Sequence, residues 1–475
     1  MERLAFGTDG WRALIGDGFT HRDLGRAAQA YAEHLLDRGG GRVLVAHDTR
    51  FAGARFARVA AEVLHANGLE VALHDGPLPT PVLSFAVRHL GAAGGVMLTA
   101  SHNPSEWQGF KLKGAHGGTA LDAVYRDVER RTGFIGADAV RRRRRAPELP
   151  AFDVREAYYA QLATLLDLDA LRQATGVVVH DAMGGAAGGW ISGFARWAGI
   201  GTEVAELRAR PDPTFDGVHP EPLPRHLART RAYLADHPGT RFAIVTDGDG
   251  DRVAAVLLDG RFFDPHQVFA VLLDLLDRRG APGSVVKTFT VSRVVERLAA
   301  SRGRAVLETP VGFKHLVEPL RRGEAMLAGE ESGGFGVAGH VPERDGILNG
   351  LLLLEAEVRA GEPLAARFAA LEREAGWRHA YDRLDLRLRD EGLARRVAEA
   401  LEHAPNAFGG ARVIDVERLD GVKLDLEGDR WILFRASGTE PQLRVYAEGP
   451  DDAAVASLLG AARGFVDALA GQSST

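Results

Sequence analysis

The stretch from Thr99 to Lys111 reads Thr-Ala-Ser-His-Asn-Pro-Ser-Glu-Trp-Gln-Gly-Phe-Lys and holds three side chains capable of chemistry. Ser101 is a candidate nucleophile, and His102 and Lys111 are candidate carriers of a proton or of positive charge. A serine hydroxyl reacts at neutral pH only when a base or a metal ion lies beside it. We therefore expect this segment to act together with a second segment from elsewhere in the chain.

An acidic segment far along the chain is the expected partner, since it places Asp247, Asp249 and Asp251 at every second position with glycines between them. Carboxylates that close repel one another unless a cation neutralises them. Oxygen ligands without His or Cys indicate Mg²⁺ or Ca²⁺ rather than zinc. The alternative is a calcium loop that only stiffens the fold, but the downstream Gly and Glu of an EF-hand are missing at the required offsets. We therefore expect a catalytic metal. Because Mg²⁺ favours few protein ligands plus a phosphate oxygen, we also expect a ligand that carries a phosphate.

A segment near the end of the chain suits the binding of an anion. Arg435-Ala-Ser-Gly-Thr439 offers a guanidinium, two hydroxyls and a glycine that frees backbone N–H groups to converge on a phosphate. Arg444 lies a little further along and adds a second positive charge. A structural Ser-Gly turn is the competing interpretation of this segment.

A glycine-flanked segment, Gly329-Glu-Glu-Ser-Gly, places carboxylates and a hydroxyl together in a loop. These groups suit the vicinal hydroxyls of a sugar. The segment can also be compared with the Gly-Asp-Ser-Gly-Gly of trypsin-like proteases. However, the chain has an α/β pattern and no matching His and Asp context, so we expect sugar recognition instead.

The serine and aspartate segments each follow an apolar run that predicts a buried strand. Ala92–Leu98 ends at the serine segment, and Phe242–Thr246 ends at the aspartates. A third strand, Arg42–Ala46, ends in the polar residues His47-Asp-Thr-Arg50. Open α/β sheets place their ligands at the carboxyl ends of strands, so these segments are predicted to lie at a ligand site.

The chain is too long for one hydrophobic core, and its 475 residues predict three or four domains of about 100–150 residues each. As far as Arg359, strands alternate with helices, a pattern that predicts largely parallel sheets with crossovers. The remainder changes character and is typical of an α+β domain with an antiparallel sheet. We place the first domain boundary near the arginine run Arg141–Arg145.

The composition does not point to a charged macromolecular partner. The chain is 45% hydrophobic and 26% charged with a net charge of −6, which gives no indication of nucleic-acid or membrane partners. An anionic substrate must therefore be held by a local basic pocket. The run Arg141–Arg145 is interpreted as a solvated linker rather than a nucleic-acid patch.

The absence of cysteine excludes disulfides and thiolate–metal sites. Met1–Gly10 lacks a signal-peptide pattern, and we identify no apolar run of the about 18 residues needed to span a bilayer. A cytoplasmic protein is therefore expected.

Five motifs together resemble the α-D-phosphohexomutase family, the phosphoglucomutase/phosphomannomutase group. They occur in the family's order and span the whole chain, although the first motif taken alone is equally consistent with an N-terminal hairpin. The opening motif resembles Phe6-Gly-Thr-Asp-Gly-Trp-Arg12, and the phosphoserine loop resembles Thr99-Ala-Ser-His-Asn-Pro. The metal loop is matched by Asp247-Gly-Asp-Gly-Asp-Arg252 and the sugar-recognition loop by Gly329-Glu-Glu-Ser-Gly. The phosphate-binding loop is matched by Arg435-Ala-Ser-Gly-Thr-Glu-Pro.

The resemblance implies an α/β protein with four domains around a central cleft. Three would be similar α/β domains with mixed or parallel sheets, and the fourth a C-terminal α+β domain with an antiparallel sheet. We expect these domains over residues 1–148, 149–256, 257–375 and 376–475.

The resemblance also implies a phosphoryl transfer. Phospho-Ser101 would donate its phosphoryl group to a sugar monophosphate, and the resulting bisphosphate would reorient and return its other phosphate to the serine. The implied cofactors are one Mg²⁺, bound by the Ser101 phosphate with Asp247, Asp249 and Asp251, and glucose 1,6-bisphosphate as activator and intermediate. Such a metal and cationic side chains suit a loose transition state, in which positioning does most of the remaining work.

Further site residues are implied by their position in the family's motifs. Arg12 and Lys111 would lie beside the phosphoserine, with Lys111 as a candidate for general acid/base help. The implied substrate contacts are Arg252 at the transfer site, the backbone of Val311 and Gly312, Glu330 and Ser332 at the sugar hydroxyls, Arg344 as a basic contact, and Arg435, Ser437, Gly438 and Thr439 at the non-reacting phosphate, with Arg444 as a second charge.

Local sequence differences favour glucose as the sugar. Glu308–Lys314 and Glu330-Glu-Ser look closer to the glucose-type branch than to the phosphoglucosamine branch, which usually has Gln between Glu and Ser. The opening Gly-Trp-Arg departs from the Gly-Ile-Arg common in glucosamine-type relatives. Gly334 stands where many dual-specificity relatives carry His. We expect glucose 1-phosphate as the substrate, with phosphomannomutase or dual activity as the alternative, and phosphoglucosamine mutase as a further one.

Two other classes of function stay open at this point. A sugar-phosphate binding module that lost catalysis is one, although an intact Ser101 with three aspartates argues against it. A hexose bisphosphate synthase or phosphatase is the other, since it would share the covalent step. Small-molecule sugar phosphates are the expected partners, and the pattern does not distinguish a monomer from a homodimer.

Overall fold

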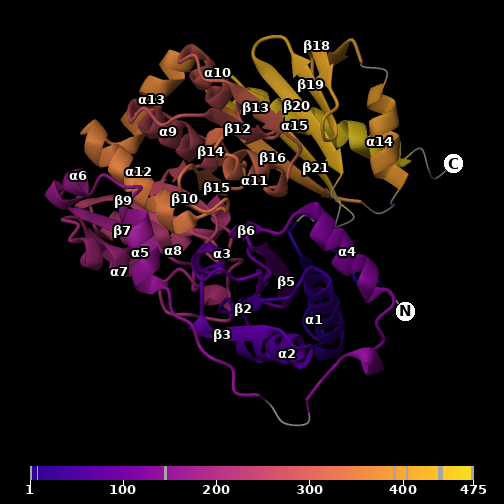
Figure 1. The fold of residues 1–475 in the computed structure, drawn as a ribbon. Helices are drawn as coiled ribbons and strands as arrows, with labels where there is room; N and C mark the ends of the chain where they lie inside the picture. Colours follow the sequence, from indigo (N-terminus) through magenta and orange to yellow (C-terminus); the bar gives the residue numbers. More distant parts are fainter. Residues whose placement is uncertain are drawn as a thin grey trace. The chain divides into compact units, whose positions relative to one another are not determined.

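The computed structural model describes residues 3–7, 9–143, 147–388, 392–402, 405–436 and 442–471. The chain forms two compact units, each built from two segments. The first unit contains Met1–Ser284 and Gly312–Arg367, and the second contains Val285–Val311 and Phe368–Thr475. Helices and strands alternate along most of the chain, whereas the last part is dominated by the sheet drawn in yellow (Figure 1).

The first sheet has the strand order β1-β5-β4-β2-β3, with β6 paired to β5. Its strands are β1 (Trp11–Leu14), β2 (Arg42–His47), β3 (Glu70–Pro77), β4 (Gly94–Leu98), β5 (Trp107–Gly114) and β6 (Gly118–Thr119). Strands β3, β2 and β4 are parallel, but β5 is antiparallel to both β4 and β1. The prediction of a largely parallel sheet is therefore wrong for its β5 side. The connection from β4 to β5 is too short for the crossover of about a dozen residues that parallel neighbours need.

Helices cover the first sheet and enclose its core. They are α1 (His21–Leu36), α2 (Gly53–Ala66), α3 (Thr80–His89), α4 (Asp122–Thr132) and the 3₁₀ turn η1 (Ala137–Ala139). Thr20 caps α1 by accepting a hydrogen bond from the backbone N–H of Asp23 at 3.1 Å. Helix α2 packs on α1 and on strands β2 and β3 (Figure 1). The buried core between them includes Tyr31, Val45 and Phe110.

The second sheet repeats this arrangement, with the order β11-β10-β9-β7-β8. Its strands are β7 (Val177–Asp181), β8 (Glu203–Leu207), β9 (Thr240–Thr246), β10 (Val253–Leu257) and β11 (Phe262–Phe263). Strands β9, β7 and β8 are parallel, whereas β10 returns antiparallel to β9 and pairs with β11. The Asp247–Arg252 segment is the short connection that forces this reversal.

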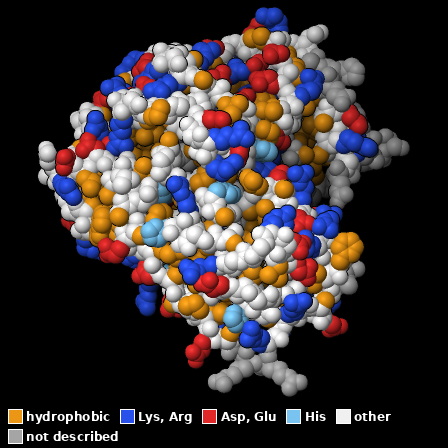
Figure 2. Space-filling model, viewed as in Figure 1, with side chains coloured by type: hydrophobic (Ala, Val, Ile, Leu, Met, Phe, Trp, Pro, Cys, Tyr) orange, Lys and Arg blue, Asp and Glu red, His pale blue; other side chains and the backbone are white. Residues whose placement is uncertain are grey.

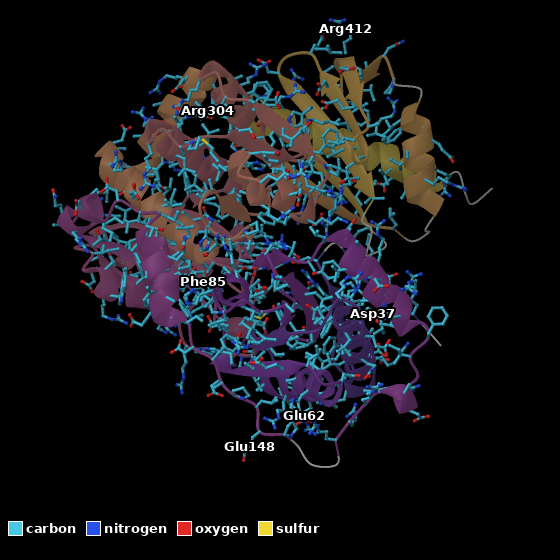
Figure 3. The ribbon with its side chains drawn as sticks, viewed as in Figure 1. Asp37, Glu62, Phe85, Glu148, Arg304 and Arg412 are labelled. Atoms are coloured by element: carbon cyan, nitrogen blue, oxygen red, sulfur yellow. The ribbon has the colours of Figure 1, made fainter. Side chains whose placement is uncertain are left out.

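The second sheet has its own helices, of which α5 (Arg155–Ala163) packs against α3 of the first sheet. The others are α6 (Leu168–Gln173), η2 (Phe215–Gly217), η3 (Pro224–His226), α7 (Trp190–Ala198) and α8 (Ala228–Asp236). Phe85 on α3, labelled in Figure 3, meets the ring of Tyr158 on α5 edge-on, with ring centroids 5.6 Å apart. Such aromatic contacts join the two layers within the first unit.

A third hairpin completes the first unit. Strand β14 (Ala325–Gly329) pairs antiparallel with β15 (Phe335–Val337), and the predicted sugar-recognition segment connects them. The helices of this part are α9 (Pro265–Arg278), α11 (Lys314–Arg321) and α12 (Gly346–Ala360), and α13 (Leu364–Ala375) continues into the second unit. Helix α12 is buried along nearly its whole length, and Asp345 caps its N-terminus.

The second unit contains a parallel pair and a large antiparallel sheet. Strands β12 (Ser284–Thr288) and β13 (Val306–Thr309) are parallel and joined through α10 (Arg293–Ser301). The antiparallel sheet, with the order β16-β21-β20-β19-β18-β17, confirms the predicted change of character. Its elements are β16 (Ala380–Arg387), α14 (Gly392–Glu402), β17 (Ala407–Phe408), β18 (Ala411–Glu417), β19 (Val422–Leu426), β20 (Arg430–Ala436), β21 (Gln442–Gly449) and α15 (Asp452–Gly471).

Helix α15 is the one described helix with the length and composition to cross a membrane, over Asp452–Ala470. The sequence analysis did not identify this stretch. Val455, Leu458 and Val466 of this helix belong to the hydrophobic core beneath the antiparallel sheet. A core helix passes the same test of length and composition, so α15 is weak evidence for a membrane.

Charged side chains are mixed on the face of the molecule shown in Figure 2. Lys and Arg side chains lie interspersed with Asp and Glu side chains over this face. The distribution agrees with the small net charge of −6.

Glu448 forms a polar centre inside the second unit. The indole N–H groups of Trp431 and Trp377 donate to its carboxylate at 2.6 and 3.0 Å. The Ser292 hydroxyl also donates to it, and His379 Nδ1 lies 3.3 Å away. Burial opposes ionisation, but the contacts with His379 and Ser292 outweigh it and lower the pKa of Glu448 to about 2. The carboxylate therefore stabilises the fold in its charged form.

We expect Glu448→Gln to lower the free energy of unfolding by about 3 kcal/mol at pH 7. Because the pKa in the native protein is below the ordinary value of 4.5, this stabilisation is present above pH 4.5 and is lost as the pH falls toward 2. Urea unfolding at pH 7 and at pH 3 measures it, and the difference from the wild type should shrink at pH 3. The control is Glu427→Gln, which changes an exposed carboxylate of the same domain. Equal stability of Glu448→Gln and the wild type at pH 7 would contradict this account.

Candidate active site

Ser101 lies on the turn that joins β4 to β5, in an uncommon backbone conformation. Its φ is +53°, in the left-handed region, which is strained for a residue other than glycine. The side chain is buried, and Oγ donates a hydrogen bond to Asp247 Oδ2 at 3.0 Å. His102 Nδ1 lies 3.3 Å from the same Oγ atom. The predicted nucleophile therefore lies beside both the acidic loop and His102.

The two glycines of the acidic loop are needed for different structural reasons. A Cβ atom on Gly248 would lie 2.7 Å from the carbonyl oxygen of Ser101, so a side chain here would push the two loops apart. Gly250 has a φ of +73°, and its carbonyl oxygen accepts a hydrogen bond from the N–H of Gly346 at 3.0 Å. The glycines thus allow the aspartates to reach the serine turn.

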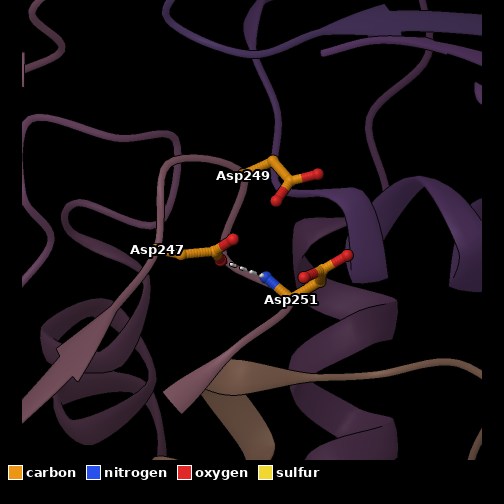
Figure 4. A group of neighbouring side chains, drawn as sticks. All are labelled: Asp247, Asp249 and Asp251. Carbon is orange, nitrogen blue, oxygen red and sulfur yellow. Dashed lines mark hydrogen bonds between the residues drawn. The ribbon is translucent and has the colours of Figure 1, made fainter. Parts of the chain in front are cut away.

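Each aspartate of the acidic loop uses at least one carboxylate oxygen in contacts with the protein, and Asp247 uses both. Asp247 Oδ1 accepts the backbone N–H of Asp251 at 3.0 Å and closes the loop (Figure 4). Asp249 Oδ2 accepts from Lys111 Nζ at 2.9 Å. Asp251 Oδ2 lies 3.2 Å from Lys111 Nζ and 2.8 Å from Arg344 Nη2. These contacts fix the direction of each carboxylate.

The remaining carboxylate oxygens suit a metal ion. Asp249 Oδ1 and Asp251 Oδ1 are buried and have no hydrogen-bond partner among the described residues. One oxygen from each of the three aspartates lies within 4.8 Å of the other two. Burial and repulsion from its two neighbours raise the pKa of Asp247 well above its ordinary value of 3.8. Since a buried carboxylate oxygen without a partner is costly and all the donors are hard oxygens, the group fits Mg²⁺.

Lys111 is a buried ammonium group surrounded by carboxylates. In addition to Asp249 and Asp251, its Nζ lies 3.0 Å from Asp9 Oδ2. Burial opposes its charge, but these carboxylates outweigh burial and raise the pKa of Lys111 above its ordinary value. The surroundings therefore favour the charged form of Lys111.

Asp9 is a site residue that the sequence analysis missed. Its Oδ2 contacts Lys111 Nζ and lies 2.5 Å from Arg344 Nη2, while Oδ1 accepts from the Thr119 hydroxyl at 3.0 Å. Burial is outweighed by Lys111 and Arg344, which hold the pKa of Asp9 well below its ordinary value. The available signal was its place in the opening motif, three residues before Arg12.

Two predicted arginines lie against the serine turn and the acidic loop. Arg12 Nη1 donates to Asn103 Oδ1 at 2.8 Å, next to the nucleophile. The backbone N–H of Arg252 donates to Asp247 Oδ1 at 3.1 Å, and its Nη1 lies 3.5 Å from Glu221 Oε1. Arg252 Nε is buried with no acceptor among the described residues.

The predicted sugar-recognition loop brings Glu330 and Gly312 together. Glu330 Oε1 accepts the backbone N–H of Gly312 at 3.1 Å, and Oε2 lies 3.5 Å from Arg344 Nη1. Burial raises the pKa of Glu330 to about 7, although the nearby Arg344 opposes the shift. Ser332 lies in the same loop and is half-buried.

Gly334 leaves room for Arg344. A Cβ atom at position 334 would lie 2.2 Å from Arg344 Cδ and 2.8 Å from its Cγ. The aliphatic stem of Arg344 therefore occupies the space that a side chain at 334 would need. This contact ties the residue singled out for sugar specificity to a predicted substrate contact.

The second unit holds the other predicted residues. Asp420 Oδ2 accepts from the backbone N–H of Val311 and from Arg435 Nε, both at 2.9 Å. Arg435 on β20 is the direct cross-strand partner of Arg444 on β21. Two cations opposite one another repel, and this repulsion is offset by Asp420 beside Arg435 and by Asp385, 4.0 Å from Arg444 Nε. Ser437, Gly438 and Thr439 lie outside the described residues.

Protein-family comparisons cover nearly the whole chain. The phosphoglucomutase/phosphomannomutase domain models match residues 3–135 (alpha/beta/alpha domain I), 156–260 (alpha/beta/alpha domain II), 264–374 (alpha/beta/alpha domain III) and 389–463 (C-terminal domain). The chain belongs to the phosphoglucomutase/phosphomannomutase family. Its four-domain organisation, with mixed sheets and a C-terminal antiparallel sheet, is therefore confirmed.

Relatives in this family carry different substrate names. The chain is 28% identical to a phosphoglucomutase/phosphomannomutase of Thermococcus kodakarensis, over 94% of this chain and 95% of that protein. It is 32% identical to a phosphoglucosamine mutase of Frankia casuarinae, over 96% of each. A crystal structure from Thermus thermophilus, assigned as a phosphomannomutase, has 43% identity and a TM-score of 0.88, and the match covers 98% of this chain and 99% of that one.

Membership of the phosphoglucomutase/phosphomannomutase family establishes the class of reaction. The chain is a phosphohexomutase, an intramolecular phosphotransferase of the isomerase type. The relatives differ in the sugar that they are named for, so the family does not decide the sugar.

We expect Mg²⁺ to raise the Tm of the metal-free protein through the acidic loop. At a Mg²⁺ concentration 100 times its Kd, the stabilisation is about 2.7 kcal/mol. Asp249→Asn should lose most of this rise, because it removes one charge from the group of free oxygens. Asp259→Asn, which changes an exposed aspartate between β10 and β11, serves as the control and should keep the rise. The same rise in Asp249→Asn as in the wild type would refute the metal site.

Proposed function

We propose that the protein is a phosphoglucomutase, which interconverts glucose 1-phosphate and glucose 6-phosphate through phospho-Ser101. The observation that carries the proposal is the contact of Ser101 Oγ with Asp247, in a loop whose other aspartates have buried oxygens without partners among the described residues. A phosphorylated serine at this position would bring phosphate oxygens to the aspartates, which is the ligand set that Mg²⁺ favours.

The proposed reaction consists of two phosphoryl transfers. The phosphoryl group leaves Ser101 Oγ for the free hydroxyl of a glucose monophosphate and gives glucose 1,6-bisphosphate. The sugar reorients, and the other phosphoryl group returns to Oγ. The sugar hydroxyl loses its proton as it attacks, and Oγ takes up a proton as the phosphoryl group leaves; His102 Nδ1, 3.3 Å from Oγ, is close enough to carry it.

Fixed charges stabilise the transferring group. Mg²⁺ held by Ser101 phosphate, Asp247, Asp249 and Asp251 would neutralise the phosphoryl oxygens when bound. Lys111 and Arg12 hold positive charge beside the turn without any need to move. Preorganised cations of this kind act on the charge of a loose phosphoryl transition state.

Binding of the sugar and of its second phosphate is assigned to separate groups. Glu330 and Ser332 would accept and donate hydrogen bonds at the sugar hydroxyls, and Val311 and Gly312 would contribute backbone contacts. Arg344, with a buried Nε that has no acceptor among the described residues, supplies a further donor. The non-reacting phosphate would lie at Arg435, with Arg444 opposite it and Ser437, Gly438 and Thr439 following it in sequence.

Glucose is proposed from the loop sequence and from the packing of Arg344. The loop has Glu rather than Gln before Ser332, and Arg344 fills the space beside Gly334. Mannose phosphate is the second candidate substrate, because the 43% identical Thermus thermophilus protein is assigned as a phosphomannomutase.

A coupled assay distinguishes these sugars. With Mg²⁺ and trace glucose 1,6-bisphosphate, kcat/KM is compared for glucose, mannose and glucosamine 1-phosphates. We expect a clear preference for glucose. Comparable mannose turnover would establish dual specificity, a preference for glucosamine 1-phosphate would overturn the assignment of the sugar, and no turnover of any of them would overturn the mutase.

Ser101→Ala should lower kcat by about 10⁴-fold or more, because it removes the atom that carries the phosphoryl group. Binding of glucose 1-phosphate, measured by calorimetry, should change little. Ser105→Ala on the same turn, which removes an exposed hydroxyl, is the matched control and should keep its activity. Substantial mutase activity in Ser101→Ala would rule out Ser101 as the carrier.

Arg435→Ala should raise KM by roughly tenfold to a hundredfold with a smaller effect on kcat, because it removes a charged hydrogen bond to the non-reacting phosphate. Arg412→Ala, an exposed arginine on the same sheet, is the control and should leave KM unchanged. An unchanged KM in Arg435→Ala would exclude this role.

A further inference from the structure

Arg50 uses every one of its N–H donors within the serine turn and its support. A guanidinium has five N–H donors in a rigid plane. Nη2 donates to the carbonyl oxygens of Ser101 and Asn103 at 2.7 and 2.6 Å. Nη1 donates to those of Pro104 and Trp107 at 2.6 and 3.1 Å. The fifth donor, Nε, is directed to Asp48 Oδ2 at 3.1 Å.

These contacts act on backbone that would not hold its shape alone. Four carbonyl dipoles, three from the serine turn and one from the first residue of β5, point to a single cation, and dipoles that converge in this way repel one another without it. Ser101 also has a left-handed φ of +53°. Strained backbone of this kind persists only when the surroundings hold it. The side chain of Arg50 is fully buried, and Phe215 covers its plane at 4.9 Å, so water does not replace these hydrogen bonds.

A second path reaches the same residue through Thr99. The backbone N–H of Ser101 donates to Thr99 Oγ1 at 2.8 Å, and this hydroxyl donates to Asp48 Oδ2 at 2.6 Å. Asp48 in turn pairs with Arg50 through Nε and through the backbone N–H of Arg50 at 3.0 Å. The N–H and the C=O of Ser101 are therefore both held by one buried Asp–Arg pair at the end of β2.

We propose that Arg50 is the positioning residue that holds Ser101 in its reactive conformation, with Asp48 and Thr99 completing the support. Arg50 makes no contact with the reacting oxygen and acts through the backbone of the turn. The role rests on the proposed function of Ser101 as the phosphoryl carrier. Because the transferring group must meet the metal loop and the acceptor in line, a small displacement of the turn slows transfer more than it weakens binding.

Arg50→Lys is the informative substitution. The lysine keeps a positive charge for Asp48, so it does not leave a buried carboxylate without a partner. Its ammonium has three donors on one atom and cannot reach four carbonyls in a plane. We expect kcat to fall by about 100-fold, with KM within a factor of about three of the wild-type value.

Arg26→Lys is the matched control for the loss of a buried arginine. Arg26 is buried in the same domain and donates to the backbone carbonyls of Thr132 and Ile135 at 2.7 and 2.9 Å, away from the serine turn. We expect it to lower the Tm as Arg50→Lys does but to leave kcat within about twofold of the wild type. If the two variants reduce kcat equally at matched folded fractions, Arg50 has only a structural role and the proposal fails.

The Thr99 path provides an independent pair of variants. Thr99→Ser keeps the hydroxyl that joins Ser101 to Asp48, whereas Thr99→Val keeps the shape and removes it. We expect Thr99→Val to lower kcat by about tenfold and Thr99→Ser to retain most of it. Equal kcat values for the two variants would overturn this part of the support.

The assay separates failure of this proposal from failure of the proposed function. Steady-state kcat and KM are measured with glucose 1-phosphate and trace glucose 1,6-bisphosphate. The rate of phosphorylation of Ser101 by the bisphosphate is followed by mass spectrometry. An active, Ser101-phosphorylated wild type with an equally fast Arg50→Lys variant refutes positioning by Arg50. A wild type without turnover and without phosphorylation at Ser101 refutes the carrier itself.

Discussion

The balance of charge in a buried space is the constraint on which the site depends. Asp9, Asp249 and Asp251 surround the ammonium group of Lys111, and Arg344 bridges two of these carboxylates. Because burial removes water from each group, every charge must find its counter-charge within contact distance. Lys111 contacts one oxygen of Asp249, and Lys111 and Arg344 together contact one oxygen of Asp251. The other oxygen of each of these two carboxylates has no partner among the described residues. The interactions that fix these carboxylates therefore also leave a group of oxygens that fits a metal ion.

The loops meet because the same local architecture occurs three times. In the first unit, the serine, acidic and sugar-recognition segments each connect two antiparallel strands, β4 to β5, β9 to β10 and β14 to β15. A short connection at the end of a sheet exposes its polar groups while the strands on either side fix its ends. Glycine at position 248 then lets the acidic loop approach the serine turn closely. Chemistry that is distant in sequence thus lies together on rigid supports.

Much of the site could be predicted because its chemistry is encoded locally. Three aspartates at alternate positions predict a shared cation without knowledge of the fold, and one oxygen of each lies within 4.8 Å of the other two. Asp9 was missed because its importance comes from partners about 100 and 335 residues away. The strand direction of β5 was missed because alternation of helices and strands does not reveal which connections are too short for a crossover. The support of Ser101 by Arg50 could not be predicted either, because it consists of hydrogen bonds between segments about 50 residues apart in the sequence.

Transfer of a labelled phosphoryl group tests the central claim most directly. Enzyme phosphorylated at Ser101 with a labelled phosphate is isolated and mixed with an excess of unlabelled glucose 1-phosphate, and the products are separated after a single turnover. The account predicts that label leaves Ser101 at the rate of turnover and appears first in glucose 1,6-bisphosphate and then in glucose 6-phosphate. Label that stays on the enzyme while the sugar turns over, or that appears only as inorganic phosphate, would contradict it.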